Sequence, residues 1–198
     1  MTAAANTPIT AADILPPDAY ERTRAATRAA MIELKRRRRV AVGPHVTVFF
    51  ECRDTMLYQI QEMLRAERGG EAQLAGELDA YNSLVPGGAE LVATLMIEID
   101  DERLRHMALS GLGGIEETVS LSVDGEEVAA RPETEVERTT AEGKTSAVHF
   151  LHFPFTPPLV ERFRRPGVRV VLAVAHPAYA HMAVLPPGTV AALAGDFS

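Results

Sequence analysis

The sequence predicts an α+β fold, with helices mainly in the N-terminal half packed on a largely antiparallel sheet. Apolar residues recur at helical spacing in most segments before residue 110, whereas short alternating strands and tight turns follow residue 115. Strands and helices do not alternate as regular units, which argues against a doubly wound sheet. The 198 residues suffice for one sizeable core. We therefore expect residues 1–12 to be a flexible segment and residues 13–198 to form a single α+β domain.

The first expected elements are a long helix and a short hairpin. Residues 18–37 carry Tyr20, Met31 and Leu34 at helical spacing, so one face of this helix can pack. The helix ends in basic residues, which the helix dipole favours at that end. Valine-rich segments separated by a Gly-Pro turn then predict strands over 40–42 and 46–51.

Two more helices, a strong strand and a short helix complete the first half. Asp54 is expected to cap a helix over 55–68, because its carboxylate can accept from the first N–H groups. Leu57, Ile60 and Leu64 form the apolar stripe of that helix, and two glycines end it. The same reasoning predicts a helix over 71–82, an alternating strand over 90–100 and a short helix over 101–110.

The second half predicts strands joined by turns. Asp124-Gly125 between alternating apolar residues indicates a tight hairpin, and Glu142-Gly143-Lys144 indicates a second turn. Apolar strands are expected over 147–155 and 168–175, with a short helix between them and a strand over 180–185 pairing back on 168–175; a final helical turn is expected between 187 and 195.

Polar side chains gather where the strand over 46–51 meets the helix over 55–68. A helix start exposes unpaired N–H groups, so this junction is a candidate for recognition or catalysis. Carboxylates that converge with a basic and an amide group can orient a polar ligand or perform acid–base work. The candidate site residues are Glu51, Arg53, Gln59, Glu62 and Glu98. The alternative interpretation is a structural salt-bridge network that holds helix to sheet.

Composition restricts the compartment and the partners. The net charge of −7 and the isoelectric point near 5.4 argue against nucleic acid or an anionic membrane as the main partner. The N-terminus lacks the pattern of a secretory signal, and no apolar run approaches the length of a membrane span. The single cysteine fits a reducing compartment. We expect a cytoplasmic protein, and the sequence shows no cofactor-binding motif that would name a cofactor.

Cysteine and histidine give no metal signature. The six histidines show no ligand spacing, and His149 and His152 lie on opposite faces if 147–155 is a strand. No metal site is therefore predicted. Cys52 precedes a helix and neighbours Arg53, which favours a lowered thiol pKa, but a small buried residue is the preferred interpretation.

The basic run Lys35–Arg39 is the densest charge in the chain. A solvated helix end explains it most simply. Binding of an anionic cofactor or of the acidic face of a partner is the alternative.

Four blocks of sequence resemble one family. They are KRRRRVAVGPHVTVFFECRDTMLYQIQEMLRAE, GELDAYNSLVP, ELVATLMIEID and HFLHF, and they lie within residues 10–175. In order and spacing they resemble the bacterial and archaeal family known as domain of unknown function 3501. The positions that match the family's polar pattern are Glu51, Thr55, Gln59, Glu62, Met63, Glu67, Glu77, Tyr81, Asn82, Thr94 and Glu98. Cys52 lies outside that pattern.

The resemblance implies a context rather than a reaction. Members of the family tend to be encoded beside a rubrerythrin-type protein and an iron–sulfur protein similar to a heterodisulfide reductase subunit, which suggests peroxide or redox metabolism. The first hypothesis is therefore an accessory protein acting with such partners. The alternatives are a small-molecule enzyme that uses the Glu/Arg cluster near residue 51, and a ligand or metal sensor.

Overall fold

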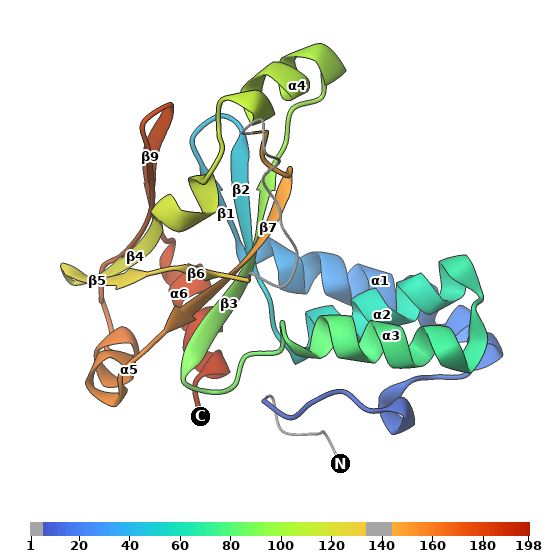
Figure 1. The fold of residues 1–198 in the computed structure, drawn as a ribbon. Helices are drawn as coiled ribbons and strands as arrows, with labels where there is room; N and C mark the ends of the chain where they lie inside the picture. Colours follow the sequence, from blue (N-terminus) through green and yellow to red (C-terminus); the bar gives the residue numbers. More distant parts are fainter. Residues whose placement is uncertain (1–5, 134–143) are drawn as a thin grey trace.

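The computed structural model describes residues 6–133 and 144–198 and has an α+β fold (Figure 1). The helices are α1 (Pro17–Arg36), α2 (Arg53–Glu67), α3 (Gly70–Asn82), α4 (Glu102–Ser110), α5 (Pro157–Phe163) and α6 (Pro187–Leu193), with 3-10 turns at Ala11–Asp13, Ile115–Thr118 and Ala194–Asp196. The three long helices precede residue 83, as predicted, and three shorter helices follow later.

The strands form two antiparallel sheets, where the sequence predicted one. The five-stranded sheet has the order β1-β2-β3-β7-β6, with β1 Arg39–Val42, β2 Val46–Phe50, β3 Glu90–Ile97, β7 Val148–Pro154 and β6 Arg131–Pro132. The four-stranded sheet has the order β5-β4-β8-β9, with β5 Glu126–Ala129, β4 Val119–Val123, β8 Val170–His176 and β9 Tyr179–Val184. The predicted pairing of 180–185 with 168–175 is confirmed by β9 and β8. The turn predicted at Glu142-Gly143 lies outside the described residues.

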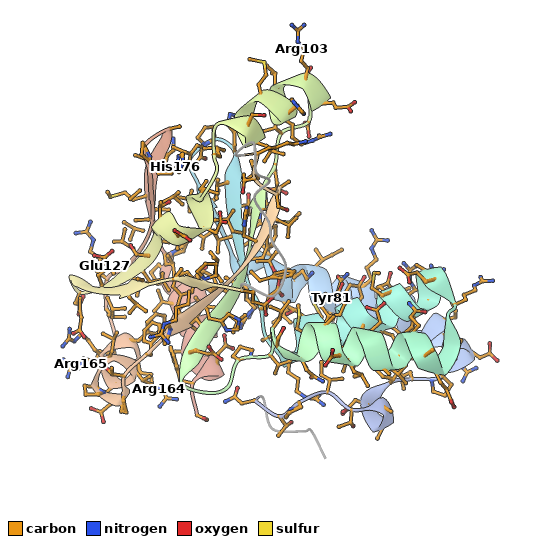
Figure 2. All side chains as sticks on the ribbon, viewed as in Figure 1. Tyr81, Arg103, Glu127, Arg164, Arg165 and His176 are labelled. Atoms are coloured by element: carbon orange, nitrogen blue, oxygen red, sulfur yellow. The ribbon has the colours of Figure 1, made fainter. Side chains whose placement is uncertain are left out.

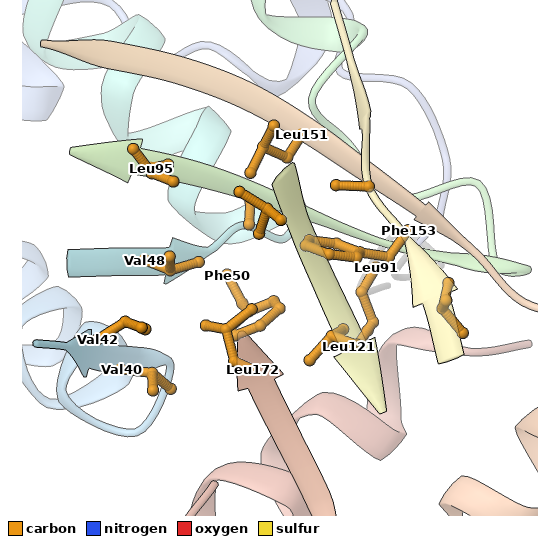
Figure 3. Packing of buried hydrophobic residues seen from close by; sticks show 14 of the residues in the cluster. Val40, Val42, Val48, Phe50, Leu91, Leu95, Leu121, Leu151, Phe153 and Leu172 are labelled. Atoms are coloured by element: carbon orange, nitrogen blue, oxygen red, sulfur yellow. The ribbon is translucent and has the colours of Figure 1, made fainter. Parts of the chain in front are cut away.

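The main core lies between the two sheets (Figure 3). Alternation places Val48 and Phe50 of β2 and Leu95 of β3 on one face of the larger sheet. They pack toward Leu121 of β4 and Leu172 of β8 in the smaller sheet. All five side chains are at most 1% exposed, so this face of each sheet is fully removed from water.

Helices cover the opposite face of the larger sheet. Met56 and Ile60 of α2 pack with Val92 of β3 in a second apolar cluster. Ile9 belongs to the same cluster, and its N–H donates to Oδ1 of Asn82 at 2.7 Å while its carbonyl accepts from Asn82 Nδ2 at 2.9 Å. The flexibility expected for residues 1–12 stays a prediction; within that range, Ile9 is anchored to α3. We call α1, α2 and α3 the helical arm; it extends to one side of the sheets (Figure 1).

The helix α2 begins two residues earlier than predicted. Cys52 is its N-cap residue, and the Cys52 N–H donates to Oγ1 of Thr55 at 2.9 Å. Asp54, the predicted cap, lies exposed in the first turn instead. There its negative charge still favours the helix N-terminus.

The hydroxyl of Tyr179 forms hydrogen bonds between the two sheets at one edge. The hydroxyl of Tyr179 in β9 accepts from the N–H groups of His45 and Val46 at 2.9 and 3.0 Å and donates to the Val42 carbonyl at 2.7 Å. The turn between β1 and β2 passes close to β9 at Gly43, which has a φ of +75°. A Cβ at Gly43 would lie 2.7 Å from the tyrosine oxygen, so this turn needs glycine for both its conformation and its space.

Candidate functional site

Glu51 and Glu98 lie at opposite ends of the larger sheet. Their strands pair antiparallel, with the Glu51 N–H donating to the Val92 carbonyl and the Glu98 N–H donating to the His45 carbonyl. The two points lie at Glu51 and His45, six residue steps apart along the chain, which is about 20 Å at the usual rise of a strand. The prediction that these two carboxylates converge is therefore wrong, because the antiparallel pairing of neighbouring strands places their C-terminal ends apart.

Glu51 instead forms a buried polar cluster with two threonines. Thr55 donates to one carboxylate oxygen at 2.6 Å and Thr94 donates to the other at 2.7 Å. The exposed fractions of Glu51, Thr55 and Thr94 are 5%, 0% and 9%. All three belong to the polar pattern of the resembled family. Since they come from the end of β2, the first turn of α2 and the middle of β3, the cluster joins helix to sheet.

Arg53 and Glu98 contact other partners. Arg53 forms an ion pair with Asp13 at 2.7 Å, and its Nε donates to the Thr7 carbonyl at 3.0 Å, so it faces the N-terminal segment. Hydrogen bonding from the Thr10 backbone, with a further contribution from Arg53, lowers the pKa of Asp13. Glu98 is exposed and lies 3.8 Å from Arg39. Gln59 lies half-buried on α2.

Glu62 joins α2 to α1. Arg24 binds its carboxylate with two hydrogen bonds of 2.8 and 2.7 Å, and Tyr20 donates a third. The Arg24 guanidinium is the largest cause that lowers the pKa of Glu62 to about 2. Burial and the neighbouring Glu62 raise the pKa of Tyr20. At neutral pH the carboxylate is ionised and the phenol is neutral, so this pair holds two helices together and is a poor acid–base couple.

The five predicted residues thus divide among separate contacts rather than forming one constellation. The concave surface of the arm lies elsewhere, along the seam between α1 and α2. One cavity of about 600 Å³ is lined by Leu15, Leu64 and Leu74, and a second of about 570 Å³ is lined by Met31 and Leu57. Tyr20 and Gln61 line both cavities.

Gln61 is a structural residue that the sequence did not reveal. Its side chain is 6% exposed, accepts from the Leu15 N–H at 3.0 Å and donates to the Leu15 carbonyl at 3.1 Å. It thereby ties the segment before α1 to α2 beside the two cavities. The sequence gives no local sign of this role, because a glutamine in a charged helix is usually solvated.

The basic run contains one buried arginine. Arg38 is 4% exposed, and its guanidinium donates to the carbonyls of Phe50 and Glu51 at 2.9 and 3.0 Å and forms an ion pair with Asp196. Burial raises the pKa of Asp196, and Arg38 opposes that shift. The prediction of a solvated helix end holds for Arg36 and Arg37, which are exposed and share Glu33, but it is wrong for Arg38.

Burial raises the pKa of the Cys52 thiol. The nearby Arg38 opposes this shift but does not reverse it. A protonated thiol is a weak nucleophile and a weak metal ligand. The structure therefore gives no support to a reactive thiolate at the N-terminus of α2.

A histidine lies between two carboxylates on the helix-covered side of the larger sheet. Nδ1 of His152 lies 3.1 Å from Glu90, and Nε2 lies 3.6 Å from Glu133. The hydrogen bond with Glu90 is the largest cause that raises the pKa of His152, and the same bond lowers the pKa of Glu90. Sequence reasoning missed this cluster, because Glu90 is 62 positions away from His152 in the chain.

Replacing His152 with glutamine is expected to lower stability more at about pH 6 than at about pH 9. The folded-state pKa of His152 is raised above its ordinary value of 6.5. Its contribution is therefore fully present below pH 6.5 and is lost as the pH rises through the raised value. Urea unfolding of both proteins at each pH measures the effect, with His106→Gln on the exposed side of α4 as control. An equal loss at both pH values would contradict the charged contact.

The described residues show neither a metal cluster nor a membrane helix. Within 6–133 and 144–198, no group of three or more His, Cys, Asp or Glu side chains is arranged to hold a metal ion. In the same ranges, the helices are too short or too polar to cross a bilayer.

These features define an α+β protein in which two antiparallel sheets enclose one core and a helical arm packs on the outside of the larger sheet. The chain belongs to the family described as "Protein of unknown function (DUF3501)", which matches residues 8–197, so the resemblance seen in the sequence is confirmed. Its fold is similar to the crystal structure of a novel protein of unknown function from Burkholderia pseudomallei K96243. That structure has 39% sequence identity and a TM-score of 0.90 and covers 97% of this chain and 100% of its own. No curated protein matches the chain.

Proposed function

We propose that this protein is a cytoplasmic accessory protein that docks on an acidic protein partner through α1. The observation that carries the proposal is the exposure of that helix: of its 20 residues, Tyr20 and Met31 are buried. Helices in proteins owe most of their stability to tertiary packing, so a long helix with so little packing is suited to a further partner.

The side of α1 that faces away from α2 combines arginines with apolar residues. We call it the outer face of α1, and it consists of Arg22, Ala25, Arg28, Ala29, Ile32 and Arg36. Ile32 is 62% exposed. Glu33 offsets the charge of Arg36, but Arg22 and Arg28 keep the face basic although the whole chain carries a net charge of −7, so it is complementary to a partner with an acidic surface.

The family context supports a choice of partner. The resemblance implies neighbours of the rubrerythrin type and of the iron–sulfur type, so these are the partners we propose, and peroxide or redox metabolism is the proposed process. The carboxylates Glu51 and Glu62, each already bound by neighbouring side chains, fit a structural role in such an accessory protein.

The test is calorimetric titration of the purified protein with a purified rubrerythrin-type protein. We expect binding at low salt that weakens at high salt, and a loss of about tenfold in affinity for Arg28→Glu. Arg103→Glu is the matched control, because Arg103 points away from the molecule at the far end of α4 (Figure 2). Equal losses for the two variants, or no binding to either type of partner at low salt, would overturn the docking proposal.

A ligand sensor is the second candidate, and the cavity of about 600 Å³ beside Tyr20 favours it. Native mass spectrometry of the same preparation separates the two functions. A small molecule bound in a one-to-one ratio, together with no partner binding, would replace the first proposal by the second.

A further inference from the structure

The strand β9 leaves one edge of the smaller sheet open. It is the last strand in the order β5-β4-β8-β9, and β8 is its paired neighbour among the described residues. The Leu185 N–H donates to the Val170 carbonyl at 2.9 Å, which fixes the alternation along the pair. Along one strand of an antiparallel pair, every second residue points its N–H and C=O groups at the neighbouring strand, and the residues between point theirs away. Ala180, Met182 and Val184 therefore turn their N–H and C=O groups away from β8.

Within Tyr179–Val184 this edge carries no lysine, proline or bulge, three of the devices that prevent strands of different molecules from pairing. Natural edge strands carry lysine, proline or a bulge, or are covered by another segment. The sequence of β9 is YAHMAV, and its register with β8 is regular over all six residues. Met182 and Val184 are 75% and 56% exposed. Figure 1 places β9 at the margin of the molecule, on the side opposite to the helical arm.

The outer face of the sheet beside this edge is neutral, and the ionisable His181 of β9 lies on the other face. The outer face of β8 and β9 is formed by Val171, Ala173, Ala175, Ala180, Met182 and Val184, which carry no ionisable group. Two copies of a chain with net charge −7 repel each other over much of their surface. Two identical copies therefore repel each other least where both contribute neutral, apolar residues.

We propose that two copies of this chain pair through β9 into a symmetric dimer. An antiparallel arrangement about a two-fold axis places Met182 opposite the partner's Met182 and Ala180 opposite the partner's Val184. All outward N–H and C=O groups of these three residues then form hydrogen bonds, because each such residue of one copy meets one of the other. The result is a continuous sheet of twice four strands.

A second copy fits this edge better than an unrelated extended peptide. The two-fold operation matches each donor with an acceptor without any further sequence requirement, and it keeps the six neutral side chains on one continuous face. The interface is small, since stable complexes bury about 800 Å² per partner and a six-residue edge supplies only part of that area. We therefore expect a dimer with a dissociation constant in the micromolar range, about 1 to about 100 µM.

Sedimentation equilibrium of the full chain over about 1 to about 200 µM tests the stoichiometry. The expected result is a concentration-dependent shift from monomer to dimer that Met182→Lys abolishes. Met107→Lys is the matched control, because Met107 is another highly exposed methionine, at 63%, on α4. A monomer at every concentration would overturn the proposal, and so would a dimer that survives Met182→Lys.

Disulfide trapping tests the register. In a Cys52→Ala background, Met182→Cys is expected to form a disulfide-linked dimer under mild oxidation, because opposed residues in a ladder lie within disulfide range. Ala180→Cys alone is expected to stay reduced, whereas a mixture of Ala180→Cys with Val184→Cys is expected to cross-link. Equal cross-linking of all three single variants would contradict the two-fold register. The basic outer face of α1 takes no part in these measurements, so their outcome is independent of partner docking.

Discussion

Asp196→Asn is expected to lower the free energy of unfolding by about 3–5 kcal/mol. The change removes the negative partner of Arg38, a guanidinium that is 4% exposed and also donates to two carbonyls of the β2–α2 junction. Removal of one member of a buried ion pair leaves the other charged and without its counterion in a place that water does not reach. Urea denaturation followed by circular dichroism measures the loss.

The matched control is Glu33→Gln, which breaks the exposed pairs with Arg36 and Arg37 and is expected to leave the stability nearly unchanged, because water and salt screen exposed pairs. The double variant Arg38→Met with Asp196→Leu is expected to recover only part of the stability. Apolar residues often replace a buried pair at little cost, but the carbonyls of Phe50 and Glu51 then lack their donor. A loss of less than about 1 kcal/mol for Asp196→Asn would contradict the burial of this pair.

Tyr179→Phe is expected to destabilise the protein by about 2 kcal/mol or more. The change deletes one oxygen that serves the N–H groups of His45 and Val46 and the carbonyl of Val42, and two of these residues are buried. Each buried polar group that loses its partner costs free energy of desolvation without compensation. Thermal unfolding measures the total effect.

Hydrogen exchange gives a sharper local measurement of the same change. The amide protons of His45 and Val46 are expected to exchange faster in Tyr179→Phe, while amides of α3 stay unaffected. Tyr81→Phe is the control, because Tyr81 lies half-buried on α3 (Figure 2). If both substitutions accelerate the exchange of the His45 and Val46 amide protons equally, the position of the Tyr179 oxygen between the sheets is not the cause of the faster exchange.

Local patterns predicted most of the elements but not how the strands divide into sheets. The alternation of β3 and the hairpin turn at Asp124-Gly125 are readable because neighbouring residues decide them. The choice of β7 to pair with β3, rather than with the later strands, depends on contacts between residues that are more than fifty positions apart. No periodicity within a single segment carries that information.

The candidate site was predicted in part for the same reason. Glu51 and Thr55 are four positions apart, so their contact follows from the strand–helix junction, whereas Thr94 reaches them through the pairing of β2 with β3. The burial of Arg38 could have been predicted from the alternation of the strand that follows it, but the neighbouring charges of the basic run favoured a solvated interpretation. Arg38 shares the alternation of the buried Val40 and Val42, so its inward direction follows from strand parity. No local pattern could have predicted that Asp196 is its partner, because the two residues are 158 positions apart.

The ion pair of Arg38 also has a consequence for biosynthesis. Its two members are separated by 158 positions, so the acidic member is synthesised long after the arginine. A nascent chain that already contains all strands of the larger sheet still lacks the counterion for its inward-facing arginine. We therefore expect ribosome-bound intermediates to keep β1 and β2 open to proteases until translation has passed Asp196, so that closure of this edge occurs late in folding.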